Sequence, residues 1–81
     1  MEKIEIKNKD GEKVAEVHEI IGEFESGGKW KWKLTYTGWF DKEPKYDLRQ
    51  WSDNMEKYGK GVTLTKENLL ALKEILNKME Q

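Results

Sequence analysis

Apolar and polar residues alternate through most of the first two thirds of the chain, a pattern typical of half-buried β-strands. The clearest run covers residues 29–37, where Trp30, Trp32, Leu34 and Tyr36 alternate with lysines and threonines. Because side chains two apart share one face of a strand, we expect the apolar positions, Trp32 above all, to face the core. The lysines between them should then face water.

A second alternation, near the amino terminus, predicts a β-hairpin. Asp10-Gly11 suits a two-residue turn, since both residues tolerate a positive φ. Pairing outward from this turn sets Ile6 opposite Ala15 and Ile4 opposite Val17. All four apolar side chains then share one face, so the register is consistent with burial of that face.

Further β-segments follow the hairpin. Its second strand loses the alternation at Ile20-Ile21, which predicts a β-bulge or a change of face. Another strand covers residues 44–51, and in it Tyr46 and Leu48 are expected to be core. The opposite face of that strand carries Lys45, Asp47, Arg49 and Trp51. After a polar loop, residues 62–64 form a short last strand.

One amphipathic helix follows the strands. Thr65 is a suitable N-cap, Glu67 complements the helix dipole in the first turn, and the helix should run to about residue 79. Strands followed by one terminal helix give an α+β fold in a single domain, residues 1–81. Two accounts of the apolar stripe on the helix stay open, packing on its own sheet or contact with a second copy of the chain. The stripe consists of Leu69, Leu72, Ile75, Leu76 and Met79.

Composition favours the second account of the stripe. The chain has 81 residues, of which 36% are hydrophobic and 38% are charged, and no cysteine to form a disulfide. A domain of this size buries only about 60% of the surface that its unfolded chain exposes, so we expect a homodimer. The chain has no basic-then-apolar leader and no apolar run of about 20 residues. We therefore expect a soluble, cytoplasmic protein without a membrane partner.

The basic charge is concentrated in the middle of the chain. Residues 1–28 hold four lysines and eight acidic residues, whereas residues 29–61 hold eight basic and five acidic residues. The same middle segment holds all four tryptophans. Cations and aromatic rings on one sheet suit single-stranded nucleic acid, because the cations follow the phosphates while bases stack on the rings.

The expected nucleic-acid contacts lie on the central strands. Lys31 and Lys33 are about 6.5–7 Å apart along an extended strand, close to the phosphate spacing of a stretched single strand. Trp51 is expected to stack on a base together with one of Trp30 or Trp39. Asp47 is expected to pair with a neighbouring lysine or arginine. The complete expected binding set is Trp30, Lys31, Lys33, Trp39, Lys45, Arg49, Trp51 and Lys60.

Other functions fit the sequence less well. His18 is the sole histidine, and Ser26 and Ser52 have no evident catalytic partner. The glutamates near His18 have the spacing of any exposed strand. We therefore expect no catalytic residue, no metal and no cofactor. The alternative function is a protein-interaction module that docks a polypeptide through exposed tryptophans and the helix stripe.

A set of motifs in the second half of the chain resembles a known family. Residues 44–51 (Pro-Lys-Tyr-Asp-Leu-Arg-Gln-Trp) are followed by residues 56–65 (Glu-Lys-Tyr-Gly-Lys-Gly-Val-Thr-Leu-Thr) and by the helix. With Gly28-Lys29-Trp30 and Trp39 upstream, this order resembles the transcriptional positive coactivator family, and within it the short bacterial YdbC-like branch. The resemblance covers about residues 16–79.

The resemblance implies a specific architecture and function. The fold would be a four-stranded antiparallel curved sheet followed by a helix, in a homodimer built through the helices and strand ends. A concave channel would bind single-stranded DNA, and in some members RNA, with little sequence preference, in transcription, replication or repair; a bacterial protein would be nucleoid-associated. The implied contacts are Arg49, Trp51, Lys60 and the Trp39-Phe40 region. Residues 1–15 lie outside the resemblance and would add a strand to the sheet edge.

Overall fold

The structure is a computed structural model, and it describes residues 3–79. Five β-strands form one antiparallel sheet in the order β1-β2-β3-β4-β5, and one helix follows them. The predicted α+β class is confirmed, and the amino-terminal hairpin supplies the fifth strand. The elements are β1 (Ile4–Lys7), β2 (Lys13–Glu25), β3 (Lys31–Trp39), β4 (Lys45–Trp51), β5 (Tyr58–Leu64) and α1 (Lys66–Lys78).

The β1–β2 hairpin has the predicted register but a longer turn. Ile6 lies opposite Ala15 and Ile4 opposite Val17, as the alternation indicates. The turn is wider than the predicted Asp10-Gly11 pair, because the register shifts directly after Ile6. Backbone and side-chain hydrogen bonds within residues 8–12 close this wider turn.

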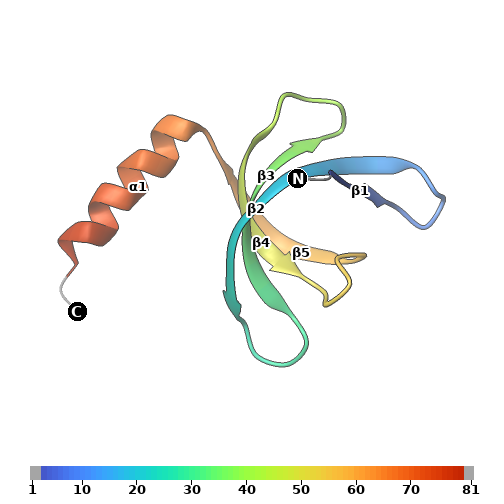
Figure 1. Cartoon of the computed structure of the whole chain (residues 1–81), viewed down its shortest axis with the longest axis horizontal. Helices are drawn as coiled ribbons and strands as arrows, with labels where there is room; N and C mark the ends of the chain where they lie inside the picture. Colours follow the sequence, from blue (N-terminus) through green and yellow to red (C-terminus); the bar gives the residue numbers. More distant parts are fainter. Residues whose placement is uncertain (1–2, 80–81) are drawn as a thin grey trace.

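Two irregularities bend β2. Its pairing with β3 shifts between Val17 and Glu19, and again between Ile20 and Gly22. The second shift lies where the sequence predicts a bulge. Because a bulge adds an unpaired residue to one strand and bends it, the sheet curls until its edge strands β1 and β5 turn toward each other (Figure 1).

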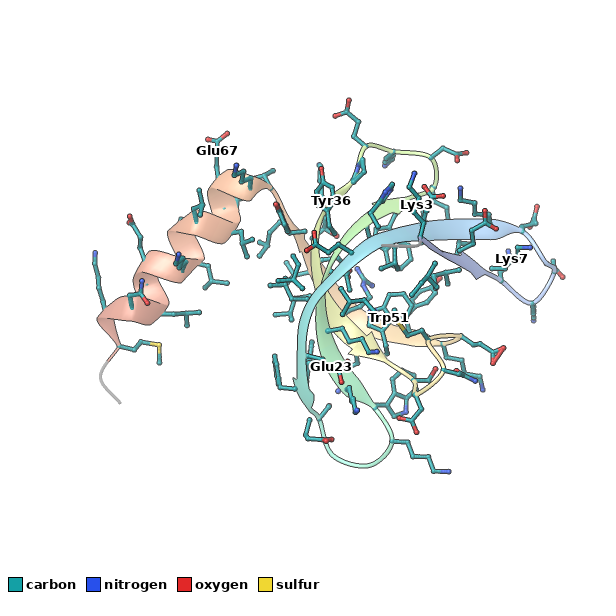
Figure 2. The ribbon with its side chains drawn as sticks, viewed as in Figure 1. Lys3, Lys7, Glu23, Tyr36, Trp51 and Glu67 are labelled. Carbon is teal, nitrogen blue, oxygen red and sulfur yellow. The ribbon has the colours of Figure 1, made fainter. Side chains whose placement is uncertain are left out.

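The concave side of the curled sheet holds the core. This inner face carries Thr35 and Asp47, which are opposite each other in the β3–β4 ladder, and the fully buried Trp51. Trp51 lies inside the curve of the sheet (Figure 2). The hydrophobic residues of this core are Ile6, Val14, Ala15, Val17, Trp51 and Met55.

The predicted assignment of the two faces is wrong. Lys33, which was expected to face water, is 8% exposed, and Thr35 on the same face is 0% exposed, because the curl encloses this side of the sheet. Polar groups tolerate this burial where they bond to one another, as Thr35 Oγ1 and Thr37 Oγ1 do at 2.7 Å. The alternating apolar row lies on the outer face and is only half-buried. Its members are Trp32, Leu34, Tyr36, Tyr46 and Leu48.

Helix α1 begins as predicted and projects from the sheet. Thr65 Oγ1 accepts a hydrogen bond from the Asn68 backbone N–H at 3.1 Å, which caps the first turn. No residue of α1 is fully buried, and the helix leaves the sheet at an angle (Figure 1). Within residues 3–79, no helix is long and apolar enough to cross a membrane.

Candidate nucleic-acid interface

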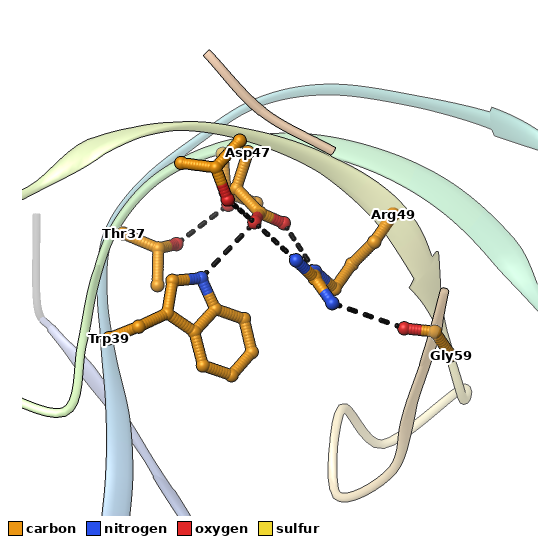
Figure 3. A network of polar contacts seen from close by, with 7 residues as sticks. Thr37, Trp39, Asp47, Arg49 and Gly59 are labelled. Atoms are coloured by element: carbon orange, nitrogen blue, oxygen red, sulfur yellow. Dashed lines mark hydrogen bonds and ion pairs between the residues drawn. The ribbon is translucent and has the colours of Figure 1, made fainter. Parts of the chain in front are cut away.

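A buried carboxylate organises the inner face of β3, β4 and β5. Asp47 is 0% exposed and accepts hydrogen bonds from Arg49 Nε at 2.7 Å and Arg49 Nη2 at 2.9 Å. It also accepts from Trp39 Nε1 at 3.1 Å and Thr63 Oγ1 at 3.2 Å (Figure 3). Arg49 Nη1 donates to the Gly59 carbonyl oxygen at 3.2 Å. The predicted pairing of Asp47 with a neighbouring cation is confirmed, and the pair fixes the guanidinium in place.

Strand β5 makes room for Arg49 through a glycine. Gly61 lies opposite Arg49 in the ladder. A Cβ atom at Gly61 would overlap the Arg49 Cβ and lie 2.5 Å from the Leu48 carbonyl oxygen. The register shifts at the next step of the ladder, which places Lys60 in a bulge. Gly61 therefore serves the packing of β4 against β5, whereas a Cβ at Gly59 would meet nothing closer than 3.5 Å.

Four aromatic rings form a cluster that runs from the core to the surface. Trp39 stacks on Trp51 with centroids 6.2 Å apart, and Tyr58 meets the Trp39 ring edge-on at 5.0 Å. The Arg49 guanidinium carbon lies 4.7 Å from the Trp39 ring centre, a cation–π arrangement. Phe40, beside Trp39, is 62% exposed and Tyr58 is 39% exposed. We call Trp39, Phe40, Trp51 and Tyr58 the aromatic cluster.

The exposed end of the aromatic cluster borders an open hollow of about 690 Å³, which we call the cluster hollow. Phe40 enters it from a left-handed backbone conformation (φ 49°), which is uncommon for a bulky residue. A hydrogen bond of 2.9 Å from its backbone N–H to the Val14 carbonyl oxygen fixes this conformation. The lining residues are Thr37, Trp39, Phe40, Lys42, Glu43, Lys45, Arg49, Tyr58 and Thr63.

The cluster hollow brings together three of the residues predicted from the sequence. Trp39, Lys45 and Arg49 all line it. Trp51 lies directly behind them, but its ring is 0% exposed and offers no face to a base. The expected stacking on Trp51 therefore does not fit its position in the core.

Lys31 and Lys33 lie on the same inner face but are held by an acidic residue. Glu23 accepts from Lys31 Nζ at 3.2 Å and lies 3.3 Å from Lys33 Nζ. The hydrogen bond from Lys31, with that from Lys33, holds the pKa of the Glu23 carboxyl below its usual value, and the same contact raises the pKa of Lys31. These two lysines are therefore less available to phosphates than an alternating strand suggests.

The remaining predicted residues lie outside the cluster hollow. Lys60 is exposed on β5, and Trp30 is half-buried just before β3, where it borders two other hollows. Six lining residues lie outside the predicted set. Among them, Lys42 adds a charge and Phe40 and Tyr58 add rings; the resemblance had implied only the region of Phe40. A strand assignment that began β5 at Tyr58 would have placed this ring beside Trp51, its partner in the ladder.

The acidic strand β2 carries the sole histidine. His18 Nε2 lies 3.3 Å from Glu16 Oε1, and neither residue lines the cluster hollow. In the part of the chain from Lys3 to Met79, no group of three or more histidine, aspartate or glutamate side chains is placed to hold a metal ion.

The outer face carries an apolar groove between the sheet and α1. Its volume is about 520 Å³. Of the predicted dimer-interface residues, Leu69, Leu72 and Leu76 line it, whereas Ile75 and Met79 are 59% and 60% exposed. The sheet contributes Phe24, Leu34, Leu48 and Leu64.

Comparison with known proteins identifies a similar protein but assigns no function to this chain. The chain matches no protein-family model. It is similar to an uncharacterized protein of Treponema pallidum (strain Nichols), with 44% identity over 54 residues. This match covers 67% of the chain and 64% of the relative, so the chain spans less than two thirds of that protein's length.

Proposed function

We propose that this protein binds single-stranded nucleic acid, DNA or RNA, in the cluster hollow and with little sequence preference. The observation that carries the proposal is the combination, in one hollow, of exposed rings and of lysines that have no ion-pair partner within residues 3–79. Bases of any sequence can stack on aromatic faces, and each stacked base contributes about 1–3 kcal/mol. The same function is what the resemblance to the transcriptional positive coactivator family implies.

Phe40 and Tyr58 are the stacking rings in this proposal. Both are partly exposed, and both are supported from behind by buried or half-buried rings of the aromatic cluster. A ring held in this way loses little conformational freedom when a base stacks on it. Trp39 has the Arg49 guanidinium over its ring, so it acts as a support for its neighbours.

Lys42 and Lys45 are the phosphate-binding residues of the hollow. Both are exposed, and neither takes part in an ion pair among the described residues. Arg49 carries a charge too, but Asp47 compensates it within 2.7 Å. Arg49 therefore holds the wall of the hollow in shape, while the two lysines supply the attraction. Glu43 on the rim opposes them.

The test is a titration of a fluorescent oligo-dT with the wild type and two matched variants. Phe40→Ala removes a stacking ring and should weaken binding by roughly five- to 150-fold, the equivalent of about 1–3 kcal/mol. Ile21→Ala is the control, because Ile21 is 44% exposed but lines neither the cluster hollow nor the outer groove. It should leave affinity unchanged. Absence of wild-type binding at physiological salt, or equal losses in both variants, would contradict the proposal.

The second part of the proposal is a homodimer formed through the outer face. The groove is apolar on both sides, and α1 leaves Leu70, Ile75 and Leu76 at least half exposed. Apolar patches of this kind in a small domain mark an interaction site. A second copy is the occupant proposed, because the domain's own core consists of few residues and a two-fold contact would cover both helices at once.

The oligomeric state tests this second part. Leu76→Glu should convert a dimer to a monomer in sedimentation equilibrium, while Glu74→Gln, at a helix position that does not line the groove, should not. A wild type that stays monomeric across the concentration range would contradict the dimer. The groove would then favour the alternative function, docking of a different polypeptide.

A further inference from the structure

Two more hollows continue from the cluster hollow along the open edge of the sheet. The first, about 570 Å³ in volume, is lined by the carboxyl end of β1, the β1–β2 turn and the start of β5. Tyr58 lines both this hollow and the cluster hollow. The second, about 360 Å³, shares Trp30, Glu56 and Lys57 with the first. The three hollows are therefore neighbours along this edge, with Tyr58 between the cluster hollow and the first and Trp30 between the first and the second.

The lining of the three hollows is strongly basic. It holds seven basic and three acidic side chains; because Asp47 compensates Arg49, three positive charges remain in excess, in a chain whose net charge is −1. None of the lysines among them forms an ion pair within residues 3–79. The basic residues are Lys7, Lys9, Lys29, Lys42, Lys45, Arg49 and Lys57; the acidic ones are Glu43, Asp53 and Glu56.

The β1–β2 turn presents its two lysines from a fixed backbone. Asn8 Oδ1 accepts hydrogen bonds from the Asp10 and Glu12 backbone N–H groups at 2.9 and 3.0 Å. The Asn8 N–H donates to the Glu12 carbonyl oxygen at 2.8 Å. Lys7 and Lys9, on either side of Asn8, are exposed, and both line the hollow beside Trp30.

We infer that the amino-terminal hairpin supplies a second segment of the binding site, which takes the continuation of the same nucleic-acid strand. The inference depends on the proposed function. In this second segment Trp30 is the stacking ring and Lys7, Lys9 and Lys57 contact phosphates. Tyr58 lies between the two segments and contacts both parts of the strand. The site thus runs beyond β3–β5 to the sheet edge.

If the hairpin forms a second segment of the site, a longer oligonucleotide should bind more tightly than a short one, and this gain in affinity should require the hairpin lysines. A short oligo-dT of about four nucleotides should fill only the cluster hollow, and one of about twelve should reach the hairpin, within the usual range for single-strand-binding domains. Two phosphate contacts at the hairpin change the slope of log K against log salt by about 1.4. At physiological salt this corresponds to roughly a tenfold difference in affinity.

The experiment compares both lengths with the wild type, with Lys7→Glu/Lys9→Glu and with Lys66→Glu/Lys78→Glu. In the first pair, Lys7 ends β1 and Lys9 lies in the turn, and both are exposed, so the fold should be retained; circular dichroism checks this. The second pair makes the same charge change at opposite ends of α1, where the two effects on the helix dipole oppose each other. Trp30→Ala adds a variant that alters the second segment without altering charge.

Support for the inference is a loss of about tenfold or more for the long oligonucleotide in the hairpin variant, with short-oligonucleotide binding and the helix variant unchanged. Trp30→Ala should likewise weaken only the long oligonucleotide. Equal length dependence in wild type and hairpin variant would overturn the inference while leaving the proposed function intact. Equal losses of affinity for the short and the long oligonucleotide in the hairpin variant would also overturn the inference. If the wild type binds neither oligonucleotide, the proposed function itself fails.

Discussion

Replacing Asp47 by asparagine tests whether the buried carboxylate holds the inner face together. Four side-chain hydrogen bonds converge on Asp47, two from Arg49 and one each from Trp39 and Thr63. Asparagine has nearly the same shape but one oxygen instead of two and no charge. Its amide N–H groups would therefore face at least one donor of this network, and the Arg49 charge would lose its partner.

The expected cost follows from the burial of the pair. Breaking a buried ion pair by removing one partner costs about 3–5 kcal/mol. Arg49 has a side-chain exposure of 17% and keeps the bond from Nη1 to Gly59, so water and the carbonyl compensate part of the loss. We therefore expect Asp47→Asn to lower the free energy of unfolding by about 3 kcal/mol. A domain of this size has a total of roughly 4–12 kcal/mol.

Urea denaturation followed by tryptophan fluorescence measures this loss. Thr63→Val is the milder companion variant, because it removes a single hydrogen bond to Asp47 and should cost about 1 kcal/mol. The stability of Thr63→Val can still be measured if Asp47→Asn does not fold. A decrease in the free energy of unfolding of less than about 1 kcal/mol for Asp47→Asn, or one no larger than that for Thr63→Val, would contradict this role of the carboxylate.

Two further predictions concern packing and charge. Gly61→Ala places a methyl group against the Arg49 Cβ and should cost about 3 kcal/mol, whereas Gly59→Ala meets nothing closer than 3.5 Å and should be nearly neutral; their urea midpoints decide. Because the pKa of Glu23 is lowered in the folded state, its ion pairs stabilise the fold above the unfolded pKa, and this contribution disappears as pH falls. Wild type should therefore exceed Glu23→Gln in thermal stability at neutral pH, and the difference should shrink once pH falls below the pKa of a free glutamate, about 4.3, and vanish below the lowered folded-state pKa; a constant difference at all pH values would contradict this.

Local features of the fold could be predicted from the sequence because each depends on a short stretch of chain. The pairing of Ile6 with Ala15 follows from alternation on either side of a turn. The bulge near Ile20 follows from a slip in the same alternation, and the cap at Thr65 from a hydroxyl before an apolar-periodic run. In each case the interacting residues are close in sequence or follow a fixed period.

The identity of the buried face depends on long-range geometry and could not be read from alternation. A period of two separates the faces of a strand but does not say which one the sheet will enclose. Curvature decides this, and it arises from bulges whose positions and size depend on pairing across the whole sheet. The polar ladder of Thr35 and Asp47 then becomes the interior, where its members bond to neighbours. Trp51 was misplaced for the same reason, since its parity with Arg49 indicated an exposed face.

The distribution of ion pairs changes where a polyanion would be held. On the inner face of the central strands, acidic residues neutralise three of the cations. Glu23 pairs with Lys31 and Lys33, and Asp47 pairs with Arg49. The lysines that line the three hollows have no such partner among the described residues, so their field extends into the hollows. Attraction for phosphates should therefore follow the rim of the curled sheet, while the strands supply a rigid aromatic wall. A sequence count of cations per strand does not distinguish these two groups, because it leaves out the acidic residues that the fold brings opposite them.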